Sequence, residues 1–267
     1  MAKTIRMFSV LLFVATFVAS VQAQEAREVQ KSGAFDKDGR VSIDTYKGSI
    51  AVSTWDKPQI EIHARIEADG YDRYERESVQ DTEVRIDLSS SSAHIKSDYD
   101  RVRHRDRGFF GIFGDDSGNL PFVHYTIKMP RTARLVIKDY KSKTTVTDLQ
   151  SDFEIETYKG EVDATTLTGS VNLETYKGRA RIEFAGLAGR SRAETYKGRI
   201  DLSLPRGKGF DLEADLGRHA RFDSDFDVDR GGRRSRHGDY DVRSSVNGGG
   251  PVLRVKSDKG TIRLLEH

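Results

Sequence analysis

The sequence predicts an all-β protein with a β-solenoid or a closely related repetitive stacked-strand architecture, in rungs of about 18–20 residues. One observation is a phrase, Thr-Tyr-Lys-Gly, at 157–160, 175–178 and 195–198, each time preceded by glutamate. A degraded copy, Asp-Tyr-Lys-Ser, stands at 139–142. A fixed period of this length is typical of stacked repeats, in which each unit buries its apolar face against its neighbours.

A second observation is the pattern inside each period, where short alternating runs end at glycines. Val162 and Ala164 alternate with Glu161 and Asp163, and the following runs repeat the pattern. Alternation at a period of two predicts strands with one buried face. The glycines are expected to supply positive φ angles or tight bends where each strand ends. Equivalent residues of stacked rungs should then lie ~4.8 Å apart.

The first 23 residues have the pattern of a secretory signal peptide. Lys3 and Arg6 precede an apolar run from Met7 to Val18, and small residues follow up to Ala23. We expect cleavage after Ala23 and an exported protein, located in the periplasm, at the cell surface or outside the cell. We expect no transmembrane span to remain after signal removal.

The rest of the chain divides into three stretches. We expect residues 24–32 to be a flexible N-terminus, 33–135 a strand-rich region, and 136–267 the repeat region. Within the second stretch, half-buried strands are predicted around 41–43, 50–52, 60–66, 84–88, 93–95 and 123–129, and an isolated full copy of the phrase stands at 45–48. The best candidate for a short helix is 71–79. We expect one continuous domain over 33–267, with two separate domains as the alternative.

Composition narrows the function classes. Charged residues make up 32% of the chain, yet the formal net charge is only +2, which argues against a nucleic-acid-binding polycation. The chain has no cysteine, so stability must come without disulfides. The seven histidines form no zinc-ligand pair at helical spacing, and we expect no metal and no cofactor.

The repeated phrase supplies the candidate interaction surface. Stacked rungs would align the tyrosines into a ladder, the threonines inward, the glutamates on the tyrosine face and the lysines at the corner. Such a ladder could bind a sugar or a protein partner through flat aromatic faces, or it could serve only to stabilise the stack. The candidate residues are Tyr140, Tyr158, Tyr176, Tyr196, Lys159, Lys177, Lys197, Glu156, Glu174 and Glu194.

Two insertions interrupt the regular pattern. In the first, a basic stretch precedes a glycine-flanked aromatic tip, which could contact a membrane surface or a partner, or fold back onto the stack. Its candidate contact residues are Arg103, Arg105, Arg107, Phe109, Phe110 and Phe113. In the second, Phe222–Gly250, aspartates alternate with apolar residues at 222–229. A strand with a solvated acidic face is the preferred interpretation over a calcium site, because the glycine-patterned loop of calcium repeats is missing.

Several short segments resemble the bacterial putative-adhesin β-strand-repeat family. They are Gly48–Val52, Trp55-Asp56, Ile60–Ala64, Tyr125–Pro130 and the closing stretch from Gly248 to Ile262. The resemblance covers most of the mature chain and implies an exported, solenoid-like protein, with no catalytic residues to carry over. The chain departs from the family's pattern by its Tyr-Lys pairs before the glycines and by its charged insertions.

These observations predict an exported, non-enzymatic, adhesin-like repeat protein that acts as a surface or periplasmic interaction module. A glycan or an envelope protein is the expected partner, with no nucleic acid, and the oligomeric state stays open. The sequence contains no Gly-x-Ser-x-Gly elbow and no phosphate-binding glycine loop. The alternatives are a carbohydrate-active β-helix enzyme, by analogy of fold, and a purely architectural envelope protein.

Overall fold

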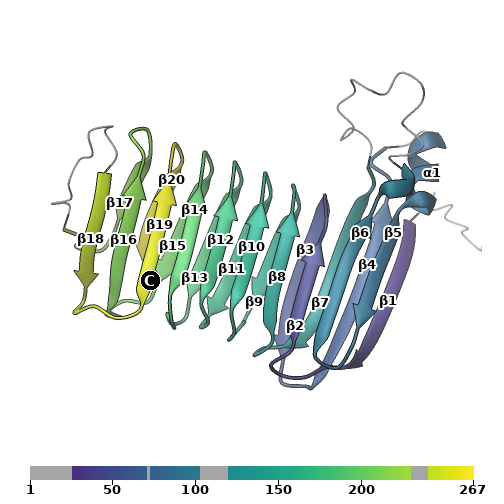
Figure 1. Cartoon of the computed structure of the whole chain (residues 1–267), viewed down its shortest axis with the longest axis horizontal. Helices are drawn as coiled ribbons and strands as arrows, with labels where there is room; N and C mark the ends of the chain where they lie inside the picture. The colour runs from purple at the N-terminus through teal and green to yellow at the C-terminus, as the bar shows by residue number, and fades with distance from the viewer. Residues whose placement is uncertain (1–25, 71–72, 103–119, 230–239) are drawn as a thin grey trace, which may run out of the picture.

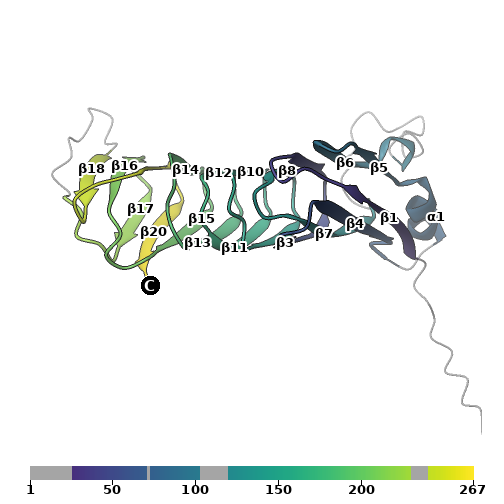
Figure 2. The ribbon, with the colours of Figure 1, turned by 90° about the horizontal axis from the view of Figure 1, so that it is seen from below.

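The computed structural model describes residues 26–70, 73–102, 120–229 and 240–267. Two ten-stranded sheets face each other along an elongated body (Figures 1 and 2). Sheet A has the order β1-β4-β7-β3-β9-β11-β13-β15-β20-β17, and sheet B the order β18-β16-β19-β14-β12-β10-β8-β2-β6-β5. The prediction of an all-β protein is therefore confirmed, whereas the narrower class of β-solenoid stays a prediction.

The strand bounds follow the alternating runs of the sequence. The N-terminal half contains β1 (Ala26–Ala34), β2 (Arg40–Asp44), β3 (Gly48–Trp55), β4 (Gln59–Glu67), β5 (Glu83–Leu88), β6 (Ser92–Asp98), β7 (Phe122–Pro130), β8 (Arg134–Asp139), β9 (Lys143–Thr147) and β10 (Phe153–Thr157). The C-terminal half contains β11 (Glu161–Leu167), β12 (Val171–Thr175), β13 (Arg179–Phe184), β14 (Ser191–Thr195), β15 (Arg199–Leu204), β16 (Phe210–Leu216), β17 (Arg221–Ser224), β18 (Tyr240–Val246), β19 (Val252–Ser257) and β20 (Thr261–Glu266).

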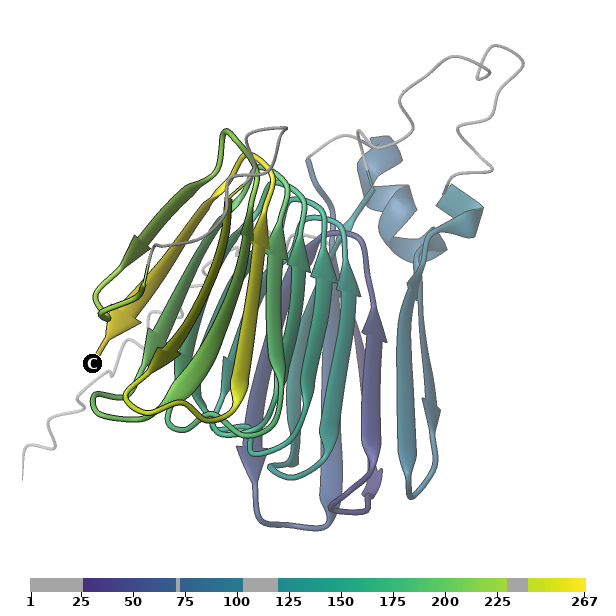
Figure 3. The same ribbon diagram turned by 60° about the vertical axis from the view of Figure 1, so that its left-hand side comes forward.

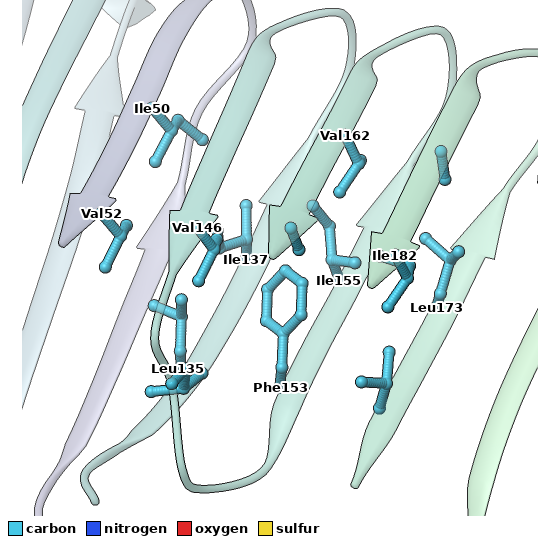
Figure 4. Close-up of a cluster of buried hydrophobic side chains, with 14 of the residues drawn as sticks. Ile50, Val52, Leu135, Ile137, Val146, Phe153, Ile155, Val162, Leu173 and Ile182 are labelled. Atoms are coloured by element: carbon cyan, nitrogen blue, oxygen red, sulfur yellow. The ribbon is translucent and has the colours of Figure 1, made fainter. Parts of the chain in front are cut away.

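From β8 to β15, successive strands alternate between the two sheets, and each pairs in parallel with the strand two places along the chain. One strand of each sheet thus forms a rung of the stack (Figure 3). The pairing is in register, so that Ile155 lies beside Leu173 and Ala180 beside Ile200. Inward-facing residues of both sheets meet in one hydrophobic core, which runs from Phe35 to Leu264 (Figure 4).

At both ends of the stack, the chain leaves the simple order. The rung of β2 and β3 lies between β6–β7 and β8–β9, and the rung of β19 and β20 lies between β14–β15 and β16–β17. The antiparallel strands β1, β4 and β7 extend sheet A at the N-terminal end. The repeat block is therefore continuous with the preceding strand-rich region through parallel pairing of β2 with β8 and of β3 with β9.

Three local expectations need correction or refinement. Residues 26–32, expected to be a flexible N-terminus, belong to β1, which pairs with β4 along its whole length. The strand predicted at 222–228 is shorter, because β17 ends at Ser224; Phe226 and Val228 nevertheless bury against the end of the core, while the intervening aspartates stay exposed. The weak helix candidate at 71–79 corresponds to α1 (Arg73–Asp81).

The predicted signal peptide, residues 103–119 of the first insertion and residues 230–239 of the second lie outside the described residues. This applies to Arg103, Arg105, Arg107, Phe109, Phe110 and Phe113, the proposed contacts of the first insertion. In the part of the chain that the structure describes, no helix is long and apolar enough to cross a bilayer.

Candidate functional site

The Thr-Tyr-Lys-Gly phrase forms the corner where the chain turns from sheet B into sheet A. The threonine points inward and is buried, and its Oγ1 accepts a hydrogen bond from the glycine N–H three residues on, at 3.0 Å for Gly178 and 2.7 Å for Gly198. The glycine is required for space. A Cβ at Gly178 would lie 2.1 Å from the carbonyl oxygen of Gly160 in the rung below. No positive φ is needed there, in contrast to Gly189 and Gly207.

Each corner places its tyrosine directly on the tyrosine of the previous rung. The ring centroids are 5.0 Å apart for Tyr140 and Tyr158, 4.7 Å for Tyr158 and Tyr176, and 4.8 Å for Tyr176 and Tyr196. The planes deviate by 13° or less. The structure adds a fifth ring, because Tyr46 stacks on Tyr140 at 4.6 Å. We call these five residues the tyrosine ladder.

The close stacking of the rings limits which part of each tyrosine a ligand can contact. Each inner ring is covered on both faces by its neighbours, so that a sugar ring cannot stack on an inner face without pulling two tyrosines apart. The expectation of binding through flat aromatic faces is therefore wrong for Tyr140, Tyr158 and Tyr176. The rings remain half-buried and can present only their edges and their hydroxyl groups. An aromatic edge carries partial positive charge and the hydroxyl both donates and accepts, so the ladder forms a polar wall.

Lysines run along the corner beside the ladder. The Nζ atoms of Lys159, Lys177 and Lys197 lie 5.5, 5.4 and 5.3 Å from the ring centroids of the tyrosines that precede them. At the C-terminal end the side chain of Lys259 covers the last ring, Tyr196, where a sixth tyrosine would otherwise stack. Its ammonium group lies 5.3 Å from the Tyr196 centroid and donates a hydrogen bond to the Tyr196 hydroxyl at 3.3 Å, which raises the pKa of Lys259.

The first lysine of the series, Lys47, differs from the others. Its side chain is fully buried, pairs with Asp69, and lies 4.5 Å above the Phe122 ring. Burial lowers the pKa of Lys47. Tyr99 meets Tyr46 edge to face at a centroid distance of 6.3 Å. The N-terminal end of the ladder is therefore covered by protein. The lysines of the later corners are exposed to solvent, namely Lys141, Lys159, Lys177, Lys197 and Lys259.

The degraded copy at 139–142 shows what the threonine normally does. Asp139 stands at the threonine position and accepts hydrogen bonds from the Ser142 N–H at 2.8 Å and from the Thr157 hydroxyl at 2.9 Å. Burial raises the pKa of this carboxyl group, and the hydrogen bonds from Ser142 and Thr157 oppose the rise. Asp139 thus closes the corner as threonine does, but it places a half-buried carboxyl group there.

Beside the ladder, on the outer face of sheet B, three glutamates lie in adjacent register positions. Glu156 pairs in the sheet with Glu174, and Glu174 with Glu194. We call them the glutamate row. Lys138 stands at the same register position in the strand before the row, and Lys256 in the strand after it.

Cations compensate the glutamate row only in part, and the negative charges of Glu194 and Glu174 both raise the pKa of Arg192. Glu194 pairs with Arg192 at 2.7 Å, while Lys138 reaches Glu156 only at 4.0 Å. Lys256 turns the other way, to Asp215 at 3.6 Å. Glu174, in the middle, makes no ion pair within 4.0 Å among the described residues. Like charges ~4.8 Å apart repel by about 1 kcal/mol per pair in water, so the row costs stability.

The glutamate row and the tyrosine ladder are the two walls of an open groove of about 580 Å³. The two rows run parallel because glutamate and tyrosine are two positions apart in every rung. We call it the Tyr–Glu groove. It is lined by Tyr140, Tyr158, Tyr176, Tyr196, Glu156, Glu174, Glu194, Lys138, Lys256, Asp139, Asp258 and the three corner threonines Thr157, Thr175 and Thr195.

Of the residues proposed from the sequence, the structure brings the four tyrosines and three glutamates into this groove and places Lys159, Lys177 and Lys197 at its outer edge. It adds Lys138, Lys256 and Asp258 to the groove and Tyr46 to the tyrosine ladder. The copy of the phrase at 45–48 was the available signal for Tyr46. The repeat also indicated Lys138, which precedes Tyr140 by two positions as each glutamate precedes its tyrosine. Lys256 had no such signal, because only the pairing of β19 with β14 aligns it with the glutamates.

A second constellation lies on the outer face of sheet A. The Ser49 hydroxyl is 2.9 Å from Nδ1 of His124, whose Nε2 is 3.6 Å from Glu67. Burial lowers the pKa of His124, which favours the neutral imidazole. Serine, histidine and a carboxylate are the residue types of nucleophilic hydrolases. However, Glu67 forms a closer ion pair with Arg65, at 2.7 Å. Within the described residues no group of three or more His, Cys, Asp or Glu side chains is arranged to hold a metal ion.

Comparison with known proteins gives structural neighbours only. No family model matches the chain, and no curated protein matches it. The chain is similar to the crystal structure of a putative cell adhesion protein from Clostridium sporogenes, with 10% identity and a TM-score of 0.46 over 91% of this chain and 100% of that one. It is also similar to that of a putative adhesin from Parabacteroides merdae, with 12% identity and a TM-score of 0.24 over 90% and 96% of the two chains. Both of these structures are described as putative adhesion proteins, the class that several segments of the sequence resemble.

Proposed function

We propose that this chain is an exported, adhesin-like interaction protein without enzymatic activity, and that it binds its partner along the Tyr–Glu groove. The observation that carries the proposal is the glutamate row. Three carboxylates in register weaken the stack, and opposite charges at these positions would strengthen it. A row that costs stability is expected where it serves binding.

The repetition of the groove supports binding over catalysis. Each rung from 156 to 196 presents the same glutamate, threonine and tyrosine, so that the groove offers several equivalent positions along its length. Catalysis requires one set of acid, base and nucleophile at a single point. A repeated groove fits a repeated ligand, for which a linear glycan is the first candidate and an extended segment of an envelope protein the second.

We further propose that the stack is a two-sided β-solenoid. The support is the alternation of successive strands between two sheets with parallel, in-register neighbours from β8 to β15. The signal pattern of residues 1–23, a basic start, an apolar run and small residues up to Ala23, supports export.

The test is a glycan array probed with purified mature protein. The matched variant is Tyr158/Tyr176/Tyr196→Phe, which removes three hydroxyl groups from the groove and keeps the ring stack. Binding by the wild type that weakens in this folded variant supports the groove as the binding surface. Equal binding by both proteins would show that the glycan binds outside the groove. If neither protein binds a glycan, an envelope protein as the partner or a purely architectural role is favoured.

The proposal of a non-enzymatic protein is tested separately at Ser49. An activated-serine reagent such as a fluorophosphonate should fail to label the wild type above the level of a Ser49→Ala variant. Labelling that depends on Ser49 and His124 would contradict the proposal and identify a hydrolase.

A further inference from the structure

We infer that Lys47 and Asp69 form an intramolecular isopeptide bond, an amide between the Nζ atom of Lys47 and the Cγ atom of Asp69, and that the Glu75 carboxylate relays the protons. This site of self-modification is separate from the Tyr–Glu groove and stands whether or not the groove binds a partner. Three features point to the bond: the inward position of Lys47, its contact with Asp69, and the place of Glu75.

The complete copies of the Thr-Tyr-Lys-Gly phrase place their lysines in two different ways. Lys159, Lys177 and Lys197 are exposed to solvent, whereas the side chain of Lys47 is 0% exposed. Gly48 has a φ of +132°, while the glycines that end the other three copies have no positive φ. The corner at 45–48 thus has a different backbone, and its lysine is turned into the protein.

The buried amine is held directly against a carboxyl group. Nζ of Lys47 contacts the carboxylate of Asp69, and the Phe122 ring centroid lies 4.5 Å from the same nitrogen. The Asp69 side chain is still 29% exposed. A fully buried ammonium group is costly, and a carboxylate that lies partly in water offsets only part of that cost. An amide removes both charges and needs no such compensation.

The surroundings of Lys47 favour its reactive form. Burial lowers the pKa of Lys47 and the charge of Lys141 lowers it further, although the hydrogen bond and the charge of Asp69 oppose this shift. A lysine of lowered pKa forms the neutral amine more readily, and the neutral amine is the nucleophile. Because the fold holds amine and carboxyl group together, the reaction is a step within one molecule and requires no collision of two.

Glu75, in the first turn of α1, is placed to carry the protons. Its carboxyl group lies over the backbone of Gly70, the residue after Asp69, since a Cβ on Gly70 would stand 1.9 Å from Oε2 of Glu75. Glycine at this position therefore leaves the room that the Glu75 carboxylate occupies. The negative charge of Glu75 also acts on Lys47, against the larger effect of burial. An acid that transfers protons thus lies next to one reacting residue and within electrostatic range of the other.

The reaction converts one ammonium group and one carboxylate into one amide and one water molecule. Lys47 first passes a proton to the Asp69 carboxylate, which leaves an amine and a neutral acid. The lone pair of the amine attacks Cγ of Asp69 and forms the C–N bond, and Glu75 accepts a proton from Nζ. Glu75 then returns this proton to the hydroxyl group on Cγ, the C–O bond breaks, and water leaves. The step needs no oxidant, reductant or further reactant.

The bond would join the corner between β2 and β3 to the segment between β4 and α1, at two points 22 residues apart in the sequence. Since α1 lies at the N-terminal end of the stack (Figure 1), the bond anchors the segment that leads into this end. A covalent link that closes a loop stabilises a protein mainly by restricting the unfolded chain. In a chain without cysteine, it would take the part that disulfides have in other exported proteins.

The experiment is intact-mass spectrometry of the purified mature protein, followed by tryptic peptide mapping. The protein should weigh less than its sequence by one water molecule. Trypsin should not cleave at the acylated Lys47, and one product should contain residues 41–65 joined to residues 66–73. The map is needed because the Asp69-Gly70 sequence can also lose water as a cyclic imide, which leaves Lys47 cleavable and the two peptides separate.

Two variants and their matched controls assign the roles. Glu75→Gln keeps the size of the side chain and removes the proton relay, with Glu77→Gln on the same helix as its control. Lys47→Met removes the nucleophile, with Lys159→Met in another copy of the phrase as its control. We expect both controls to lose one water as the wild type does, and both test variants to keep the full sequence mass. The cross-linked wild type should also melt at a higher temperature than the Glu75→Gln variant, whose folding is checked by circular dichroism.

The mass of the wild type decides the matter even if a variant fails to fold. A wild type of full sequence mass, or one that loses water only as the cyclic imide, would overturn the inference and leave Lys47 and Asp69 as a buried ion pair. Water loss that persists in Lys47→Met would place the modification elsewhere in the chain and overturn it as well. Complete cross-linking in the Glu75→Gln variant would reject the role assigned to Glu75.

Discussion

The outer faces of the two sheets arrange charges differently in one row each. On sheet A the register aligns Asp163, Arg181, Asp201, Arg263 and Asp223, so that acid and base alternate from rung to rung. Ion pairs follow this row, with Arg181 at 3.5 Å from Asp163 and Arg263 at 3.9 Å from Asp201. On sheet B, three glutamates follow one another at the register position beside the ladder.

The contrast separates charge arrangements that stabilise the stack from those that do not. Opposite charges opposite each other stabilise a sheet, and like charges destabilise it. This row of sheet A therefore has the arrangement expected of a scaffold that only has to remain folded, although elsewhere on the same face Arg179 lies beside Arg199. The glutamate row of sheet B lacks this explanation, which is why the functional proposal is placed there.

The largest expected effect concerns the corner shared by both faces. Gly178→Ala would put a Cβ 2.1 Å from the Gly160 carbonyl oxygen, a backbone atom that cannot move without separating two rungs. We expect a loss of about 3 kcal/mol or more in the free energy of unfolding, measured by urea denaturation. Gly186→Ala is the control, because a Cβ there meets nothing within 4 Å and its φ is not positive. Equal stability of the two variants would show that the rungs do not pack as closely as described.

The next effect concerns the ladder. Tyr176→Ser removes the ring that stacks at 4.7 Å on one neighbour and at 4.8 Å on the other. Two aromatic pairs at about 0.5–1.5 kcal/mol each predict a loss of roughly 1–3 kcal/mol, whereas Tyr176→Phe should retain most of the stability. An unchanged melting temperature for the serine variant would mean that the ladder contributes nothing to the stack and exists for binding alone.

The sequence alone predicts the strand order in the middle of the stack, but not at its ends. Between 135 and 204 the period, the alternation and the glycines predict the strands and the tyrosine ladder, because neighbours in space are one repeat apart in sequence. The position of β2 beside β8 could not be predicted, since about 90 residues separate strands that pair in the structure. For the same reason the place of Tyr46 in the ladder was not predicted. The repeated phrase at 45–48 could be recognised, but not that Tyr46 stacks on Tyr140.

The groove shows the same limit at a finer scale. The repeat aligned the three glutamates, but Lys256 joins their row only because β19 inserts between β14 and β16. Whether the ring faces were free for a ligand depended on the stacking distance, which no pattern of residues contains. Sequence reasoning thus found the components of the site and misjudged the exposed part of the tyrosines.

A third prediction tests the contrast between the faces directly. Glu174→Lys places a cation between Glu156 and Glu194 and should raise the free energy of unfolding by up to ~1 kcal/mol. Arg181→Glu places an acid between Asp163 and Asp201 and should lower it by a similar amount. Melting temperatures at low and high salt measure both, and each difference should shrink with salt. Destabilisation by both substitutions would remove the argument that sheet B gives up stability for binding.

The smallest effect concerns Asp139, where the corner of sheet B contains a half-buried acid in place of threonine. Because burial raises the pKa of Asp139 in the folded state, the folded protein holds this proton more tightly than the unfolded chain does. The wild type should therefore lose stability, relative to an Asp139→Thr variant, as the pH rises from below 3.8 through the raised pKa, and the difference should then stay constant. Melting curves of both proteins between pH 3 and 7 measure the difference, since titrations common to both cancel. A difference that moves in the opposite direction with pH would mean that the hydrogen bonds from Ser142 and Thr157 outweigh burial, and that the acid strengthens the corner.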